Sequence, residues 1–511
     1  MPAIPQTRGS SSMALPPPVG GWDTRESLAD MPIDRAPIMT NWFPGTDKVT
    51  MRRGNSAHAT GMTNNVETLI EYIPLTGSGQ LYAANDGKIY NVSAAGAVGS
   101  AVSSGHSNNR WQYVNVGNAA GQYVRCFNGA DTPLLFDGST WATTAITCSG
   151  MTAANLVWAN LHHRRLWVGE VDSLDAYYLS VNAVSGAATK FALGGVASMG
   201  GFIMAMGTWT RDSGSGMDDV AVFYTSEGEC VIYVGTDPAA VATWSLLGVF
   251  RIGKPVGRRC MVKGGSDLIL VTQDGFVPLS GILTMDRSQT RLVALSDQIS
   301  EAVNTSVRLY GDNFGWQPIL YPRAVMLIFN VPISNQESEQ YVFNTLTGAP
   351  ARFAGIDALC FGLLDDELYW GGNDGTVNKF DSGTSDLGEN IESDVMQAFS
   401  YFKSPASNKV FKMVDPIFES DGNPNAAVDL NVDFQTRAPT GVAAASAITS
   451  GVWGVSKWGV GLWGTSKQIF RGWRGVRGSG RSGALRIRID TATVRPSWLS
   501  TNFTYLLGGQ V

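Results

Sequence analysis

Seven short hydrophobic segments recur along this 511-residue chain, and a turn sequence divides each of them into two runs. Four place Asp-Gly or Glu-Gly between the runs, and these segments are 81–90, 222–233, 268–277 and 368–377. Three looser ones cover 123–136, 166–179 and 325–343. A tight hairpin turn needs positive φ, which Gly adopts without a steric clash and Asp or Asn tolerates. Each segment therefore predicts a β-hairpin.

The spacing of these hairpins constrains the fold further. Their turns run from near residue 86 to near residue 373 in six steps, and each step is about 48 residues, within the period of propeller repeats. In a β-propeller, small sheets called blades bury both faces against their neighbours around a central channel. The sequence predicts an all-β chain with a propeller of about seven blades over 61–385. A pair of β-sandwiches with evenly spaced hairpins is the alternative.

Composition excludes several classes of protein. Hydrophobic residues make up 44% of the chain and aromatics 10%, which excludes a wholly disordered or collagen-like chain. The longest apolar run, 324–329, is far shorter than the roughly 18 to 20 residues that span a bilayer. No secretory signal is readable, so we expect synthesis in a cytoplasm. The five Cys are widely spaced and odd in number, which favours free thiols over a disulfide framework.

Two regions flank the repeats. Residues 1–60 are rich in Pro and Gly and predict an extended N-terminal arm that is ordered only against something else. Residues 386–511 predict a second, β-rich domain, with strands at 398–402 and 409–414. The segment 427–434 alternates, with Val, Leu, Val and Phe on one face, as in a half-buried strand.

The end of the chain is basic and rich in Trp. Nine Lys and Arg but one Asp and no Glu follow residue 450, a net charge of +8, which leaves −14 for residues 1–450. Trp453, Trp458 and Trp463 are spaced by five, which fits neither a helix face nor a strand face, so we expect an irregular ribbon with docked indoles. The arginines after it are Arg471, Arg474, Arg477 and Arg481. They could contact DNA phosphates or acidic groups of neighbouring subunits, and both alternatives stay open.

Several motif-like patterns fail on their context. Gly478–Gly483 matches a dinucleotide fingerprint, but a strand-like segment follows it where a helix is needed. Gly248–Gly253 with Lys254 resembles a phosphate-binding loop, but Pro255 stands where a hydroxyl must bind magnesium. The series Asp429, Asn431 and Asp433 lacks the Gly and the Glu of a calcium loop.

Other candidate catalytic and metal-binding groups are equally weak. His162 and His163 would point to opposite faces of a regular strand, so they would not share a metal. Asp365-Asp366-Glu367 could supply two carboxylates for glycoside cleavage, although a solvated turn is the simpler interpretation. We predict no metal, no cofactor and no catalytic residue.

Both ends of the chain resemble one family. Residues 20–32, residues 36–45 with their Asn-Trp-Phe-Pro turn, and residues 49–54 with their Arg-Arg-Gly strand resemble the opening of the nozzle proteins of podophage short tails. These are also called tail tubular protein B or packaged-DNA stabilisation proteins. Segments 398–402, 411–414 and 432–434, the Trp ribbon and the terminal Gly pair resemble the C-terminal domain of that family. The resemblance implies a hexameric tube of propeller-bearing subunits below the portal and adaptor rings, with no catalytic residues.

We therefore expect a non-enzymatic virion protein that forms a ring at the end of a short phage tail, retains packaged DNA and conducts it at ejection. Its expected partners are copies of itself in a homohexamer, the adaptor ring, tail fibres or spikes, double-stranded DNA in the lumen and the host envelope. Trp453, Trp458 and Trp463 are candidate interface anchors, and Trp42 with Phe43 would pin the arm. The alternatives are a propeller that binds host glycans and a glycosidase that works through Asp365 or Glu367.

Overall fold

The computed structural model describes residues 10–212, 217–240, 242–283, 287, 293–441, 446–447 and 467–510. The chain divides into two compact units. Unit 1 comprises Met1–Ser56, Tyr341–Gly355 and Asp381–Val511, and unit 2 comprises Ala57–Gln340 and Ile356–Phe380. Propeller strands thus begin within the segment that the sequence assigned to the arm, and a short segment of its propeller range belongs to unit 1.

Unit 2 is a seven-bladed β-propeller, and its blades follow one another along the chain. Blade 1 contains β8 (Val66–Tyr72), β9 (Gln80–Asn85), β10 (Lys88–Asn91) and β12 (Ser103–Ser104). Blade 2 contains β13 (Gln112–Asn118), β14 (Gly121–Phe127), β15 (Leu134–Phe136) and β16 (Trp141–Thr143). Blade 3 contains β18 (Leu156–His162), β19 (Arg165–Glu170), β20 (Asp175–Leu179) and β21 (Gly186–Ala192), and β17 (Ile146–Thr147) pairs parallel to β21.

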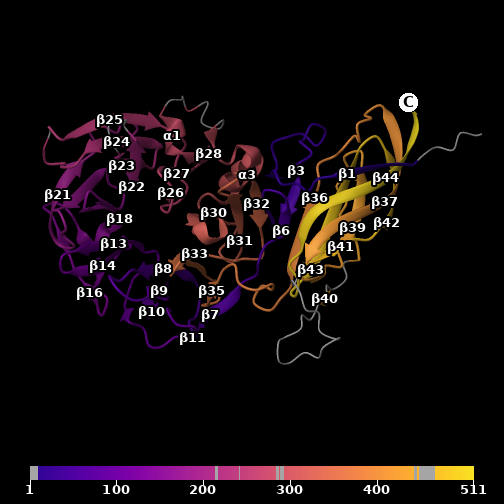
Figure 1. Cartoon of the computed structure of the whole chain (residues 1–511). Helices are drawn as coiled ribbons and strands as arrows, with labels where there is room; N and C mark the ends of the chain where they lie inside the picture. The colour runs from indigo at the N-terminus through magenta and orange to yellow at the C-terminus, as the bar shows by residue number, and fades with distance from the viewer. Residues whose placement is uncertain are drawn as a thin grey trace, which may run out of the picture. The chain divides into compact units, whose positions relative to one another are not determined.

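The remaining blades complete the ring (Figure 1). Blade 4 contains β22 (Ile203–Asp212), β23 (Met217–Thr225), β24 (Glu229–Gly235) and β25 (Trp244–Arg251). Blade 5 contains β26 (Met261–Gly264), β27 (Asp267–Thr272) and β28 (Gly275–Pro278), and α1 (Leu279–Ile282) and α3 (Ser300–Tyr310) follow it. Blade 6 contains β29 (Gln317–Tyr321), β30 (Met326–Pro332) and β31 (Ser338–Asn344). Blade 7 contains β33 (Cys360–Leu364), β34 (Glu367–Gly371), β35 (Val377–Lys379) and β7 (Ser56–Thr60), and β11 (Gly96–Ala97) pairs with β7.

The seven predicted hairpins are confirmed, and each forms the second and third strands of one blade. In blade 1, the turn between β9 and β10 is Asp86-Gly87, with φ of 50° and 67°. The ring closes because β7, from the start of the unit, supplies the fourth strand of blade 7. The innermost strands of all seven blades contribute to the lining of one central cavity of about 220 Å³, and Figure 1 shows these strands around a common centre.

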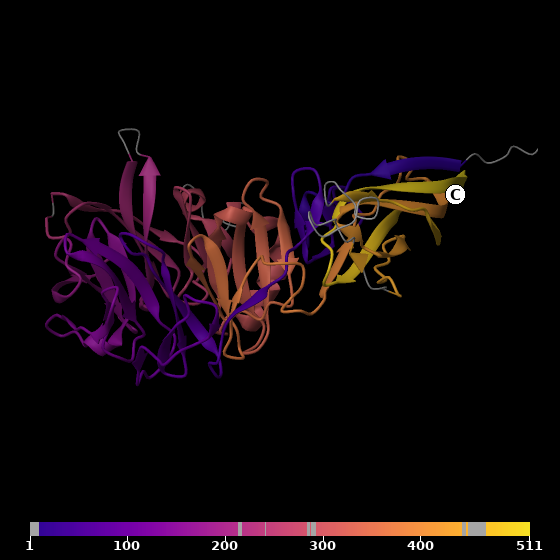
Figure 2. The same cartoon turned by 60° about the horizontal axis from the view of Figure 1, so that its bottom comes forward.

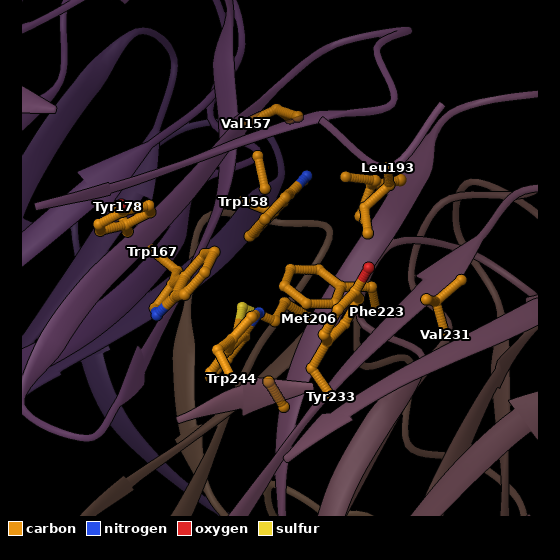
Figure 3. Close-up of a cluster of buried hydrophobic side chains, with 13 residues drawn as sticks. Val157, Trp158, Trp167, Tyr178, Leu193, Met206, Phe223, Val231, Tyr233 and Trp244 are labelled. Carbon is orange, nitrogen blue, oxygen red and sulfur yellow. The ribbon is translucent and has the colours of Figure 1, made fainter. Parts of the chain in front are cut away.

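Hydrophobic side chains fill the spaces between neighbouring blades. Between blades 3 and 4, Trp167 and Trp244 stack with ring centroids 5.7 Å apart, and Tyr233 stacks on Trp244 at 5.5 Å (Figure 3). A second cluster joins Leu69 of blade 1 to Cys360 of blade 7 and so packs the closure of the ring. Both faces of each sheet are therefore buried, as the repeat length predicts.

Unit 1 contains the N-terminal arm and the C-terminal β-domain. The arm supplies β1 (Ser10–Leu15), β2 (Gly21–Trp22), β3 (Arg35–Ala36), β4 (Ile38–Thr40), β5 (Trp42–Pro44) and β6 (Val49–Met51). Later parts of the chain supply β32 (Pro350–Phe353), β36 (Ile391–Met396), β37 (Ser407–Ser420), β38 (Gly422–Asn423), β39 (Ala427–Val432), β40 (Ser446–Ala447), β41 (Gln468–Phe470), β42 (Arg474–Gly480), β43 (Gly483–Thr491) and β44 (Ser497–Gln510).

Two sheets organise these strands. One has the order β41-β37-β44-β6-β5, with β1 paired to β44 and β42 paired to β37; the other has β32-β4-β36-β43-β39 within unit 1. The indigo β1 runs beside the yellow β44 in Figure 2, and their register pairs Ser10 with Leu506. The arm is extended, as the sequence predicts, and the strands of the C-terminal domain order it.

An aromatic cluster packs this unit. Phe402 lies 5.3 Å from Phe411 and 5.1 Å from Tyr505, between ring centroids. Gly483 of β43 must lack a side chain because a Cβ there would lie 2.7 Å from the Phe411 ring. The glycine lets an aromatic ring of one sheet reach the backbone of the other.

Two strand predictions in this unit are wrong in detail. Residues 398–402 form only an isolated bridge at Ser400, because Phe402 adopts a left-handed φ of 48°. The strand predicted at 427–434 ends at Val432, and Phe434 lies in a turn with φ of 66°.

All five Cys are free, and four of them are buried. No helix among the described residues is long and apolar enough to cross a membrane.

Candidate assembly surface

A buried ion pair locks the arm into unit 1. The guanidinium of Arg52, which is 2% exposed, forms two hydrogen bonds with the carboxylate of Asp386. Its Nε also donates to Oδ1 of Asn41 at 2.8 Å, and Nη2 donates to the carbonyl of Ala354 at 3.0 Å. The acceptors lie on Asn41, Ala354 and Asp386, so this network holds the arm segments around residues 41 and 52 against the segments around residues 354 and 386.

Asn41 and Gly54 explain why the two arm motifs have their particular residues. Asn41 has a φ of 61°, which Asn tolerates better than most residues, and its Nδ2 donates to the carbonyl of Glu392 at 2.7 Å. A Cβ on Gly54 would overlap the backbone of Ser385. The Asn-Trp-Phe-Pro and Arg-Arg-Gly segments are therefore the two sides of one packed joint.

The aromatic residues of the arm point into unit 1. Trp42 is fully buried, and the ring of Phe43 packs edge-on against Phe353 with centroids 6.3 Å apart. Both residues attach the arm within its own chain. The predicted Trp anchors, Trp453, Trp458 and Trp463, lie outside the described residues.

The four candidate arginines have different environments. Arg471 is exposed and lies 3.4 Å from a carboxylate oxygen of Asp415, whereas Arg474 is half-buried and donates to the carbonyl of Ala426. Burial lowers the pKa of Arg474. Arg477 and Arg481 are exposed. The structure thus gives Arg474 an internal role and leaves the other three facing solvent.

Exposed apolar side chains accompany these arginines. Met413 of β37 is 38% exposed, Ile469 of β41 is 56% exposed and Trp473, just before β42, is 42% exposed. Met413 pairs with Gly475 of β42. Gly475 and Arg477 are both exposed and the residue between them is less so, which places Arg477 on the same face as Met413. The backbone N–H of Gly472 donates to Asp415, which holds the Trp473 segment beside β37.

We call this surface the β37–β42 face, and it comprises Met413, Ile469, Arg471, Trp473 and Arg477. Trp, Met and Arg are enriched at protein interfaces, where Trp and Arg often dominate the binding energy. Sequence reasoning missed the apolar members of the face. Only the pairing of β37 with β41 and β42 brings them together, so no local pattern could have identified them.

The carboxylates considered for glycoside cleavage have structural roles. Asp365 and Asp366 form the β33–β34 turn, with φ of 49° and 61°, and Asp365 accepts a hydrogen bond from the N–H of Gly79. Glu367 pairs with Arg323 and lies 3.3 Å from Lys379. Asp365 is thus a turn residue, and Glu367 is held by two cations.

Other titratable groups lie in the propeller. Burial, followed by the charges of Asp365 and Asp366, raises the pKa of Glu71 to about 7. Burial, followed by the charge of His163, lowers the pKa of His162 to about 4. The two imidazoles touch, with centroids 4.4 Å apart, because His163 leaves the strand with a φ of 46°. The prediction that they point to opposite faces is therefore wrong.

The remaining motif-like segments lie in ordinary strands. Gly478–Gly483 spans the end of β42 and the start of β43, so a strand follows it as predicted. Asp429 and Asn431 belong to β39, and Gly248 and Phe250 belong to β25. Among the described residues, no group of three or more His, Cys, Asp or Glu side chains could hold a metal ion.

Comparison with known proteins adds little to these observations. No protein-family model matches the chain, and no curated protein matches it. A crystal structure of BBS1N in complex with ARL6DN, soaked with mercury, is 10% identical, covers 67% of this chain and 100% of that one, and has a TM-score of 0.42. The same complex soaked with lead is 10% identical over 66% of this chain and 99% of that one, with a TM-score of 0.38.

Raptor from Chaetomium thermophilum is a further structural neighbour. It is 9% identical and has a TM-score of 0.39, and the match covers 65% of this chain but 29% of Raptor. The propeller assignment rests on the sheet topology and on the closed ring of inner strands.

Proposed function

We propose that this chain is a structural protein of a short phage tail. In this proposal it forms a homohexameric, ring-shaped nozzle below the adaptor ring, retains packaged DNA and conducts it at ejection without enzymatic activity. The observation that carries the proposal is the exposed β37–β42 face. Four of its five residues, from Ile469 to Arg477, follow the Trp-rich segment 453–463 in the sequence. The face combines exposed apolar side chains with two exposed arginines, of which Arg471 lies 3.4 Å from Asp415.

The charge distribution supports assembly into a ring. Residues after 450 carry +8 and the rest of the chain carries −14. A basic patch on one copy can therefore meet an acidic patch on the next, and such head-to-tail contacts between unlike patches form a ring when the rotation between copies closes. Exposed Arg471 and Arg477 would supply the basic side of that contact.

The same distribution suits the passage of DNA. Proteins that grip duplex DNA do so by neutralising phosphates with Lys and Arg. A chain with a net charge of −6 and an acidic main part presents little surface of that kind. Adaptor, fibres or spikes, and the host envelope are the further partners that the proposal implies.

Two surface substitutions test assembly directly. Replacing Met413→Ser and Trp473→Ser together removes apolar contacts that are exposed in one chain, so stability should change by less than about 1 kcal/mol. Native mass spectrometry and negative-stain images of the wild-type chain should show six-membered rings, and the double variant should be monomeric. Deleting the arm is a poorer test because it removes the buried Trp42.

Leu346→Ser is the matched control, because Leu346 is 75% exposed and lies in unit 1 away from this face. The control should assemble normally. A wild-type chain that stays monomeric at all concentrations would contradict the proposed function. Normal rings in the double variant would show that the β37–β42 face is not the contact.

A further inference from the structure

Two adjoining cavities lie at the centre of the propeller. The first, of about 220 Å³, lies among the inner strands, and the second, of about 240 Å³, lies among the loops that precede them. Gln112, Arg258 and Arg259 line both cavities, and Arg110 also lines the second. No Asp or Glu occurs among the described residues that line either cavity. Three guanidiniums therefore converge on a concave site without a carboxylate in its wall.

Arg259 is fully occupied by the protein itself. Its Nη2 donates to Oγ1 of Thr68 at 2.7 Å and to the carbonyls of Glu67 at 3.0 Å and Trp111 at 3.2 Å. These acceptors belong to blades 1 and 2, whereas Arg259 precedes blade 5. The Arg259 side chain therefore connects the start of blade 5 to blades 1 and 2, and its charge adds to the positive potential in the cavities.

Arg258 differs from its neighbour. Its side chain donates no hydrogen bond to any residue that the structure describes, and its Nη1 is buried without a partner. The guanidinium carbon lies 5.4 Å from the centre of the Phe202 ring, which offsets part of the cost of burial. Burial lowers the pKa of Arg258, and the charge of Asp172 opposes that effect without forming an ion pair. Arg258 is half-buried, and a buried, unused donor on a cation is costly unless something pairs with it.

Arg110 adds a third cation at the mouth of the second cavity. Its guanidinium lies 4.4 Å from the centre of the Phe314 ring, and its Nε lies 3.1 Å from a carboxylate oxygen of Glu67. Glu67 can neutralise only one of the three guanidiniums. The cavity keeps an excess of positive charge.

We propose that the two adjoining cavities bind a small free anion where Arg258 lines both of them, and that Arg258 holds its phosphate or carboxylate group. A planar guanidinium with free donors matches the oxygens of both groups. Arg110 and Arg259 contribute the surrounding charge, and Arg259 also holds the wall in place. The site lies entirely in unit 2 and does not depend on the proposed assembly.

Calorimetric titration of the full chain with inorganic phosphate, and separately with citrate, tests the site. We expect saturable binding of at least one of them at constant ionic strength, and Arg258→Gln should weaken it by about tenfold or more. Arg251→Gln is the matched control, since Arg251 is exposed in the same unit and its side chain makes one long hydrogen bond among the described residues, 3.4 Å to Oγ of Ser198. The control should bind like the wild type.

A second variant separates a binding role from a structural one. Arg258→Met removes a half-buried charge that has no ion-pair partner among the described residues, so the anion-free protein should unfold at an equal or higher urea concentration than the wild type. Added phosphate or citrate should raise the unfolding midpoint of the wild type and leave that of the variant unchanged. The proposal is overturned if neither anion binds the wild type, or if Arg258→Met lowers the midpoint equally with and without anion.

Discussion

The two units are stabilised by contacts of very different reach along the chain. In the propeller, two residues join β9 to β10, and most strands pair with the next strand in the sequence. In unit 1, Arg52 binds Asp386 across 334 residues and Asn41 binds Glu392 across 351 residues. The first strand of the arm pairs with the last strand of the chain.

The two units therefore differ in the chain entropy that is lost when their stabilising contacts form. Local hairpins form with little loss of chain entropy, whereas unit 1 must bring distant segments together before its long-range contacts contribute. Stability in unit 2 is spread over seven similar sheets. In unit 1 it depends more on a few joints between distant segments, and the network around the buried Arg52 is one of them. Perturbations should therefore spread further in unit 1.

The largest effect should come from Arg52→Met. This change leaves the carboxylate of Asp386 and the side chain of Asn41 without their partner, and breaking a buried pair in this way costs about 3 to 5 kcal/mol. Hydrogen exchange of the full chain should show lost protection in β1, β6 and β44, while the propeller strands keep theirs. Arg53→Met is the control, because Arg53 is exposed next to the network. Unchanged protection in β1 and β44 would refute the role of this joint.

Acid should destabilise the propeller through a buried histidine, a group that unit 1 lacks. All four histidines, at 58, 106, 162 and 163, lie in unit 2. Burial lowers the pKa of His162 to about 4, below its unfolded value near 6.5. The neutral form therefore contributes stability that is present above about pH 6.5 and is lost as the pH falls towards 4.

At roughly 1.4 kcal/mol for each unit of pKa difference, this loss amounts to about 2 to 3 kcal/mol. Glu71, whose pKa is raised to about 7, opposes this loss over the same pH range, so the effect is measured by comparing two proteins. In urea unfolding at about pH 7 and pH 4.5, His162→Gln should lose less stability on acidification than the wild type, by this amount. His58→Gln is the control. If His162→Gln leaves the pH dependence unchanged, the buried imidazole is not its source.

The hairpins could be predicted because their signals are local. Asp-Gly or Glu-Gly marks the turn in four of the hairpins, and seven hairpins at one period predict a propeller. Closure of the ring by β7 could not be predicted, since Ser56–Thr60 has no turn signal and pairs with β35 far along the chain. The failed strand at 398–402 shows the same limit, because Phe402 takes a left-handed conformation that β-propensity does not reveal.

The candidate site residues also differ in whether a local sequence signal or long-range packing reveals them. The sequence singled out Trp42, whose burial within the arm joint follows from the fold. It did not single out Arg258, because an Arg-Arg pair before a strand is an ordinary pattern. Arg258 becomes a candidate binding residue only in the folded propeller, where blades 1, 2 and 5 meet around the channel. Long-range packing decides which polar residues lack partners, so sequence patterns cannot report them.

The smallest expected effect is a change confined to one interface between blades. Gly169 of β19 lies opposite Trp158 of β18, and a Cβ at Gly169 would overlap the indole. Gly169→Ala should therefore push Trp158 into the cluster between blades 3 and 4 and cost about 1 to 3 kcal/mol by overpacking. Urea unfolding gives the cost, and hydrogen exchange should place it in blades 3 and 4 alone. Gly99→Ala, at an exposed position with open space around it, should have almost no effect. Loss of protection throughout the propeller after Gly169→Ala would show that the blades are coupled as strongly as the distant joints of unit 1.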